Sequence, residues 1–210
     1  MTHSLHRRGA VEDLVDDFTI IFISARGYNE VNSEEKLKTF LRLSQKHNAV
    51  NFGNMEVGSV LEHGAEKVIE GVHDGTTVQA TFASEEDFIA IVKDLVEADL
   101  GMSVIIQGLS DKVDHCCHEA GVEPHTWNHS LGVWGITEML PPEPIMEVTT
   151  MCGHGMIAAS LVEKVAQDVK KGRLTLDQGV DVIAKPCLCG FVNPVRTRRL
   201  IQKMCEDGTV

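Results

Sequence analysis

The chain has 210 residues, enough for one large domain or two small ones with a hydrophobic core. Hydrophobic residues make up 43% of it and charged residues 24%, which is typical of a globular rather than a disordered protein. The formal net charge is −12, so nucleic acid and anionic membranes, whose phosphates attract Lys and Arg, are not expected as main partners.

The cellular compartment follows from what the sequence lacks. Residues 1–10 carry charges without an apolar stretch of roughly 7–15 residues behind them, so no secretory signal is expected. No apolar run approaches the roughly 20 residues of a membrane helix. We therefore expect a cytoplasmic protein. In that reducing compartment, six cysteines and ten histidines favour metal binding or catalysis over disulfides.

The N-terminal segment, residues 1–17, shows no hydrophobic periodicity and carries His3, His6, Arg7 and Arg8. One interpretation is a mobile arm. The alternative is an arm that folds over an active site and offers cations to an anionic ligand. The sequence leaves both interpretations open.

The first regular elements alternate in type. A continuous apolar run at 18–25 predicts a buried strand. Ser33, followed by two glutamates, predicts the start of a helix that reaches about residue 47. Residues 65–83 contain two short strand-like runs around Asp74-Gly75, a dipeptide typical of hairpin turns. Polar and apolar residues alternate in the second run, which predicts a strand with one buried face.

Two further elements complete the N-terminal half. Ser84 predicts the N-cap of another helix, and 102–107 predicts a closing strand. The order strand, helix, hairpin, helix, strand is the βαββαβ order of a ferredoxin-like sandwich. We therefore expect an α+β protein with a ferredoxin-like part at 18–108. This fold name describes topology and implies no iron.

The C-terminal half, 109–210, is expected to be a mainly helical part, rich in Cys and His, that holds a metal. Glycine, proline and capping residues mark the ends of its elements. The prediction comprises a helix at 110–120, a loop at 122–144, a strand at 145–150, a helix at 153–171, a helix from the Thr175/Gln178 capping box to Lys185, and a last helix that begins at Asn193-Pro194.

Cys152 lies at the predicted junction between a strand and a helix. Unpaired amides and the dipole at a helix N-terminus stabilise an anion, so an acidic thiol is expected there. The segment Met151–Ala158 resembles the catalytic cysteine segment of the proline racemase family, in which a thiol moves a proton at an amino-acid α-carbon. The second cysteine motif of that family is not found in this sequence. The resemblance implies a metal-free acid–base or nucleophilic role for Cys152, with His154 beside it.

Cys187 and Cys189 occupy a connection between two predicted helices that is bounded by proline and glycine. Thiols on such a loop suit a metal cluster, because loop amides donate hydrogen bonds to the sulfurs. With Cys152 they supply three thiolate ligands. Three thiolates on a four-iron cluster leave one iron open, so the sequence predicts a [4Fe–4S] centre, with zinc as the alternative metal.

A second segment rich in Cys and His runs from Asp114 to Glu119. Cys117 shares a helix face with apolar residues and is expected to pack in a core. It is also the leading candidate for a fourth metal ligand. His118 is a candidate proton carrier and, paired with His115, a candidate metal ligand.

Arg196, Arg198 and Arg199 follow the cysteine loop on the last predicted helix. Such a run is usually a solvated helix face. The alternative is a guanidinium clamp that binds a substrate carboxylate or phosphate beside the metal.

The main functional prediction is an oxygen-sensitive iron–sulfur protein. As an enzyme it would use the open iron as a Lewis acid on a small anionic metabolite, with His154 or His118 moving a proton. The alternatives are a metal-free enzyme that uses Cys152 and a non-catalytic zinc or metal-delivery protein. A homo-oligomer and a redox partner both remain open.

Overall fold

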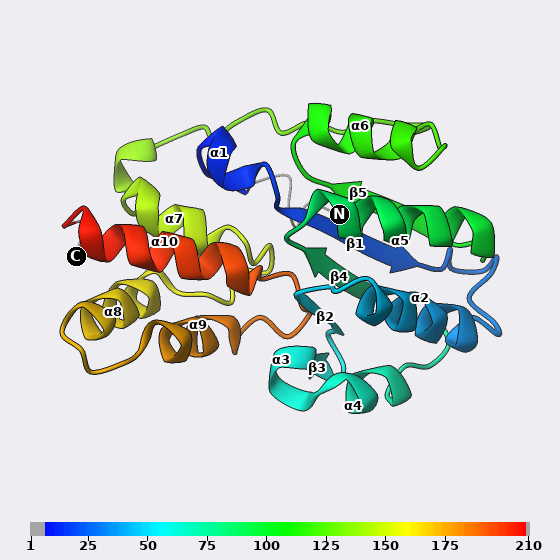
Figure 1. The fold of residues 1–210 in the computed structure, drawn as a ribbon, viewed down its shortest axis with the longest axis horizontal. Helices are drawn as coiled ribbons and strands as arrows, with labels where there is room; N and C mark the ends of the chain where they lie inside the picture. Colours follow the sequence, from blue (N-terminus) through cyan, green and yellow to red (C-terminus); the bar gives the residue numbers. More distant parts are fainter. Residues whose placement is uncertain (1–6, 209–210) are drawn as a thin grey trace.

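The computed structural model describes residues 7–208 and shows a mixed α+β protein (Figure 1). None of the helices in this part of the chain is both long and apolar enough to cross a membrane. The strands are β1 (Phe18–Ile23), β2 (Asn51–Asn54), β3 (Gly58–Ser59), β4 (Val78–Phe82) and β5 (Ser103–Gln107). The helices are α1 (Val11–Leu14), α2 (Glu34–Lys46), α3 (Val60–His63), α4 (Ala65–Glu70), α5 (Glu85–Ala98), α6 (Ser110–Glu119), α7 (Glu143–Thr149), α8 (Ala159–Lys170), α9 (Leu176–Ala184) and α10 (Pro194–Glu206), with a 3-10 turn at Thr137–Met139.

The five strands form one antiparallel sheet in the order β3-β2-β4-β1-β5. Strand β1 lies between β4 and β5, so that Ile20 faces Ala80 on one side and Ile106 on the other. The first five residues of β1 are all buried, which explains its continuous apolar sequence. The predicted buried strand is confirmed, and it ends at Ile23.

Two hydrophobic cores use opposite faces of this sheet. Successive residues of a strand point to opposite faces, and Ile20 accordingly packs in one core with α2, α5 and α6 while Ile21 packs in the other with α7 to α10. In Figure 1 the C-terminal helices, coloured yellow-green to red, form a separate group beside the sheet. Helix α6 contributes Cys116 and Cys117 to the first core, so the N-terminal core extends past residue 108.

The hairpin predicted around Asp74-Gly75 is wrong. Its first arm is helix α4, and the neighbour of β4 is β2, a strand that the sequence did not predict. Strand β2 reads Asn-Phe-Gly-Asn, and Asn and Gly are depleted in strands, so only pairing with β4 makes this segment a strand.

Asp74 instead stabilises the start of α2. Its two carboxylate oxygens accept hydrogen bonds from the amides of Glu34 and Asn32, both at 2.9 Å. The hydrogen bond from Glu34 is the main reason that the pKa of Asp74 is lowered. Ser33, the predicted cap, donates its hydroxyl proton to the carbonyl of Glu30 and accepts from the amide of Gly75.

The C-terminal half also differs from its prediction in two elements. The strand expected at 145–150 is helix α7, and Pro144 lies in its first turn, where proline is tolerated. Helix α8 begins at Ala159, so residues 152–158 form an irregular connection between two helices. The capping box of Thr175 with Gln178 is confirmed, and so is the N-cap at Asn193.

Candidate functional site

Three of the predicted ligands meet at the base of the C-terminal helices. Cys152 lies between α7 and α8, while Cys187 and Cys189 lie between α9 and α10; all three are buried. The sulfurs of Cys187 and Cys189 are 3.8 Å apart, and Cys152 is hydrogen-bonded to Cys187. Nδ1 of His154, a solvent-exposed residue, lies 3.6 Å from the sulfur of Cys189.

The cysteine loop is held against the sheet by polar residues of β2 and β4. The hydroxyl of Thr81 donates to the carbonyl of Gly190 at 3.0 Å, and Nδ2 of Asn51 donates to the carbonyl of Val192 at 2.9 Å. With its amide in the swapped orientation, Gln79 also donates to the carbonyl of Cys189 at 2.9 Å. Thr81 and Gln79 were missed because the polar positions of β4 were interpreted as a solvent face, whereas all of β4 is buried. Asn51 was missed because β2 was not predicted.

The loop also approaches the sheet backbone closely. Gly190 has a φ of +81°, and a Cβ atom there would lie 2.5 Å from the carbonyl carbon of Phe52. Only glycine combines this backbone conformation with such a contact. The sheet thereby determines where Cys187 and Cys189 lie.

The three thiols form a directed chain of hydrogen bonds. The bond from Cys187, followed by an amide bond from Phe191, lowers the pKa of Cys189 despite its burial. The hydrogen bond from Cys152 lowers the pKa of Cys187. The hydrogen bond that Cys187 donates to Cys189, together with the burial of Cys187, outweighs this effect and raises the pKa of Cys187 to about 11. Donation to Cys187, together with burial, raises the pKa of Cys152.

The acidity expected for Cys152 is thus wrong, and the fold gives the reason. The prediction relied on a helix N-terminus, but α8 begins seven residues later. Amides of His154 and Met156 do donate to the Cys152 sulfur and lower its pKa, but the bond with Cys187 and burial are stronger.

A cavity of about 350 Å³ opens onto Cys152. Its wall includes Thr150, Gly153, Gly155 and Ile157, and the two glycines leave space beside the thiol. A small molecule in this cavity would contact Cys152, whereas Cys187 and Cys189 do not line the cavity.

A metal ion requires its donor atoms at characteristic separations. Two thiolates bonded at ~2.3 Å to one tetrahedral zinc lie ~3.8 Å apart, and a thiolate and an imidazole nitrogen lie ~3.6 Å apart. The pairs Cys187–Cys189 and Cys189–His154 match these separations. Within the described residues, however, no group of three or more His, Cys, Asp or Glu side chains is arranged to hold a metal ion. Two donor pairs fit, and a complete site requires side-chain rotation.

Two of the other predicted site residues lie elsewhere. Cys117 is buried in the first core, so the structure does not bring it to the three thiols. His118 is exposed on α6, where its ring contacts Asp114 and Glu123; the carbonyl of Asp114, followed by the Glu123 carboxylate, raises its pKa. Neither residue shares a cavity with Cys152.

Arg196 is not part of a solvated helix face. Its side chain is fully buried and donates to Asp17 at 3.1 Å and to the carbonyl of Arg8 at 2.5 Å. Burial alone would raise the pKa of Asp17, but Arg7 and Arg196 hold it below its usual value. This arginine therefore has a structural partner in place of a substrate carboxylate.

Arg198 and Arg199 are also paired within the chain. Arg198 is exposed and donates to Asp177 at 3.0 Å. Arg199 binds both oxygens of Asp16 at 2.6 and 2.8 Å. The three arginines thus point to different partners and do not converge on one anion.

The N-terminal arm folds against the thiol segments. Arg7 donates to Asp17 at 2.5 Å, to the carbonyl of Met151 at 3.4 Å and to the carbonyl of Phe191. These carbonyls lie one residue before Cys152 and two residues after Cys189. The mobile-arm interpretation therefore does not hold from Arg7 onward. His3 and His6 lie outside the described residues.

Comparison of the chain with protein-family models, with curated proteins and with solved structures found no match. The resemblance of Met151–Ala158 to the proline racemase segment is therefore local.

Proposed function

We propose that this protein binds a metal through Cys152, Cys187, Cys189 and His154. The observation that carries the proposal is the contact among three buried thiols from two separate connections, with an imidazole nitrogen at the solvent side. Amides of residues that flank each cysteine donate to the sulfurs, which stabilises thiolates. The raised pKa values of Cys152 and Cys187 make these two thiols poor nucleophiles, and a metal would deprotonate them.

Zinc is the metal that the donor separations support best. The spacing of Cys187 and Cys189 suits two ligands of one ion, whereas the cysteines of a four-iron cluster each bind a different iron and lie further apart. The three-cysteine [4Fe–4S] centre remains the second candidate, supported by the three thiols and their amide donors. Bound zinc would hold the α7–α8 and α9–α10 connections together; an open iron would supply Lewis-acid chemistry at the Cys152 cavity.

Metal analysis of protein purified without oxygen tests this proposal. We expect about one zinc per chain in the wild type, and a loss of most of it in Cys187→Ser and Cys189→Ser. Cys205→Ser is the matched control, because Cys205 lies on α10 and contacts the carbonyl of Ala166 instead of the other thiols. Brown protein that contains iron and sulfide would show that the site holds the [4Fe–4S] cluster and not zinc. Metal-free protein, or equal metal in all variants, would refute the site.

A metal-free enzyme is the competing proposal, and the cavity at Cys152 favours it. In that case Cys152 would exchange a proton with a small substrate such as an amino acid, and Cys187 would be its proton partner. Alkylation of metal-free protein by iodoacetamide, followed by mass spectrometry of the modified peptide, would then label Cys152 first. Labelling of Cys189 first would contradict this alternative.

A small anionic substrate receives less support. The guanidinium groups that were expected to bind it are all paired with aspartates. An enzymatic role for a metal centre would therefore have to use the cavity at Cys152. His154 does not line that cavity, and it would move a proton only if it were not a metal ligand.

We also propose that the N-terminal part is a ferredoxin-like sandwich with an added strand, β3. Strands β2, β4, β1 and β5 follow one another in the sheet, all antiparallel, and α2 and α5 pack on one face. A cytoplasmic location is proposed as well, supported by six free cysteines.

A further inference from the structure

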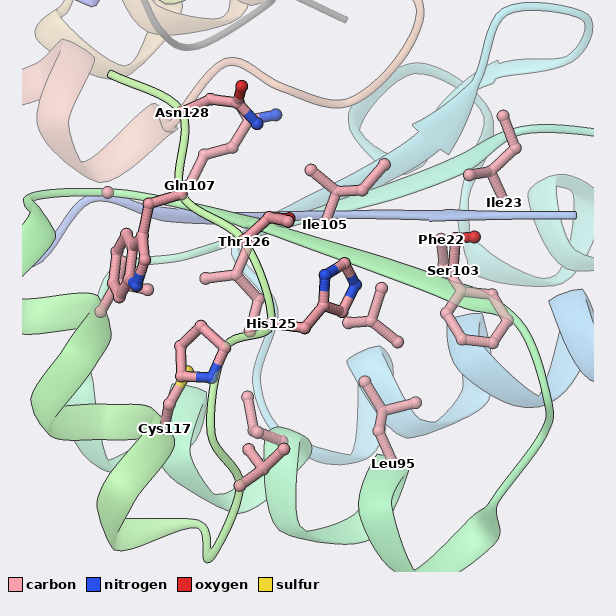
Figure 2. Close-up of a pocket in the computed structure, with 18 of the residues that line it drawn as sticks. Phe22, Ile23, Leu95, Ser103, Ile105, Gln107, Cys117, His125, Thr126 and Asn128 are labelled. Carbon is pink, nitrogen blue, oxygen red and sulfur yellow. The ribbon is translucent and has the colours of Figure 1, made fainter. Parts of the chain in front are cut away.

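A second and larger cavity lies along β5, at the edge of the sheet (Figure 2). Its volume is about 1150 Å³, and it shares no lining residue with the cavity at Cys152. The lining comes from β5, from the end of α5 and from the irregular segment 122–130 that follows α6. This volume is slightly above the range of ~300–1,000 Å³ typical of small-molecule sites.

Apolar side chains form much of the cavity wall. Figure 2 shows Phe22, Leu95 and Ile105 around it, and segment 122–130 passing β5 with His125 among them. Trp127 also lines the cavity and is 42% exposed. Its ring is parallel to that of His129, with centroids 6.2 Å apart and an interplanar angle of 4°. These flat surfaces favour an aromatic ligand.

One polar atom in the wall requires a partner. Oε1 of Gln107 is buried and accepts no hydrogen bond from the described residues. A buried acceptor without a donor is unfavourable, and most such atoms in folded proteins are satisfied. A ligand with an O–H or N–H group at this position would supply the missing donor.

The charges in the wall disfavour an anionic ligand. Arg7 is the only arginine or lysine among the described residues that line the cavity, and it is paired with Asp17. Asp99 and Glu123 add two carboxylates to the lining. A phosphate or carboxylate group would therefore meet net negative charge without a free guanidinium to bind it.

We propose that this cavity binds an uncharged aromatic molecule that carries a hydrogen-bond donor, with the donor directed at Oε1 of Gln107. The aromatic rings of the ligand pack against Ile23 and Ile105, which lie on the same face of the sheet as Gln107. This site is independent of the thiol centre, because it requires neither metal nor a free cysteine.

Isothermal titration calorimetry of the full chain with three naphthalene probes tests the proposal. 1-Naphthol carries the donor, 1-methylnaphthalene has a similar shape without it, and 1-naphthoate carries a negative charge. We expect 1-naphthol to bind about tenfold more tightly than 1-methylnaphthalene, as one buried hydrogen bond allows, and 1-naphthoate to bind most weakly.

Gln107→Met removes the acceptor and preserves the volume of the side chain. In this variant the ratio of the affinities for 1-naphthol and 1-methylnaphthalene should fall from about ten to about one. Continued binding of 1-methylnaphthalene would show that the cavity is intact. Gln45→Met, on the exposed surface of α2, is the matched control and should keep the tenfold preference. Absence of binding, equal binding of the three probes by the wild type, or an unchanged preference in Gln107→Met would overturn the proposal.

Discussion

Replacement of Asp17 by asparagine should destabilise the protein strongly. The Asp17 and Arg196 side chains have no exposed surface, and that of Arg7 is 6% exposed. Asparagine retains the shape of the side chain but leaves two buried guanidinium groups without a counter-charge. Loss of one partner of a buried ion pair costs about 3–5 kcal/mol, and we expect about 3 kcal/mol because one acceptor oxygen remains.

The neighbouring residue supplies a matched control. Asp16 pairs with Arg199, but their side chains are 29% and 39% exposed, so Asp16→Asn should cost less than about 1 kcal/mol. Urea unfolding followed by circular dichroism measures both variants. At about 2–4 °C per kcal/mol for a chain of this size, Asp17→Asn should lower the melting temperature by about 6–12 °C. A cost no greater than that of Asp16→Asn would refute the reasoning.

The pH dependence gives a second test of the same ion pair. The pKa of Asp17 in the folded protein lies below its ordinary value of 3.8. A lowered pKa means that the carboxylate stabilises the fold fully above that ordinary value and loses this effect as the pH falls through the folded pKa. The difference between wild type and Asp17→Asn should therefore be constant between about pH 5 and 8 and shrink below about pH 4. A difference that grows as the pH falls would contradict this sign.

Two further substitutions test the loop and the helix cap. Gly190→Ala should destabilise the fold by more than about 3 kcal/mol, because the new Cβ would meet the Phe52 backbone. Gly75→Ala is the control: Gly75 has a similar φ of +78° but no atom within 4 Å, so this variant should cost only about 1–2 kcal/mol of stability. Equal costs in urea unfolding would exclude the close approach of the loop to β2. Asp74→Ala should cost about 1 kcal/mol and speed hydrogen exchange in the first turn of α2, whereas unchanged exchange there would rule out the cap.

Local signals in the sequence determined several elements correctly. The apolar run of β1 requires burial on both faces, and the Thr175/Gln178 box and Asn193 satisfy the first amides of their helices with their own side chains. Such signals act within a few residues, so they are visible without the fold. The prediction that Cys152, Cys187 and Cys189 belong together also came from the sequence, through their positions outside regular elements.

Tertiary structure decided the elements and charges that depend on distant residues. Strand β2 exists because β4 pairs with it, and Asp74 caps the start of α2, 40 residues away, in place of forming a hairpin. Cys117 was excluded from the thiol group because α6 packs on the opposite face of the sheet. Arg196 resembles a surface residue in the sequence, and only the fold supplies Asp17 as its buried partner, since the desolvation of a charge depends on what surrounds it in space.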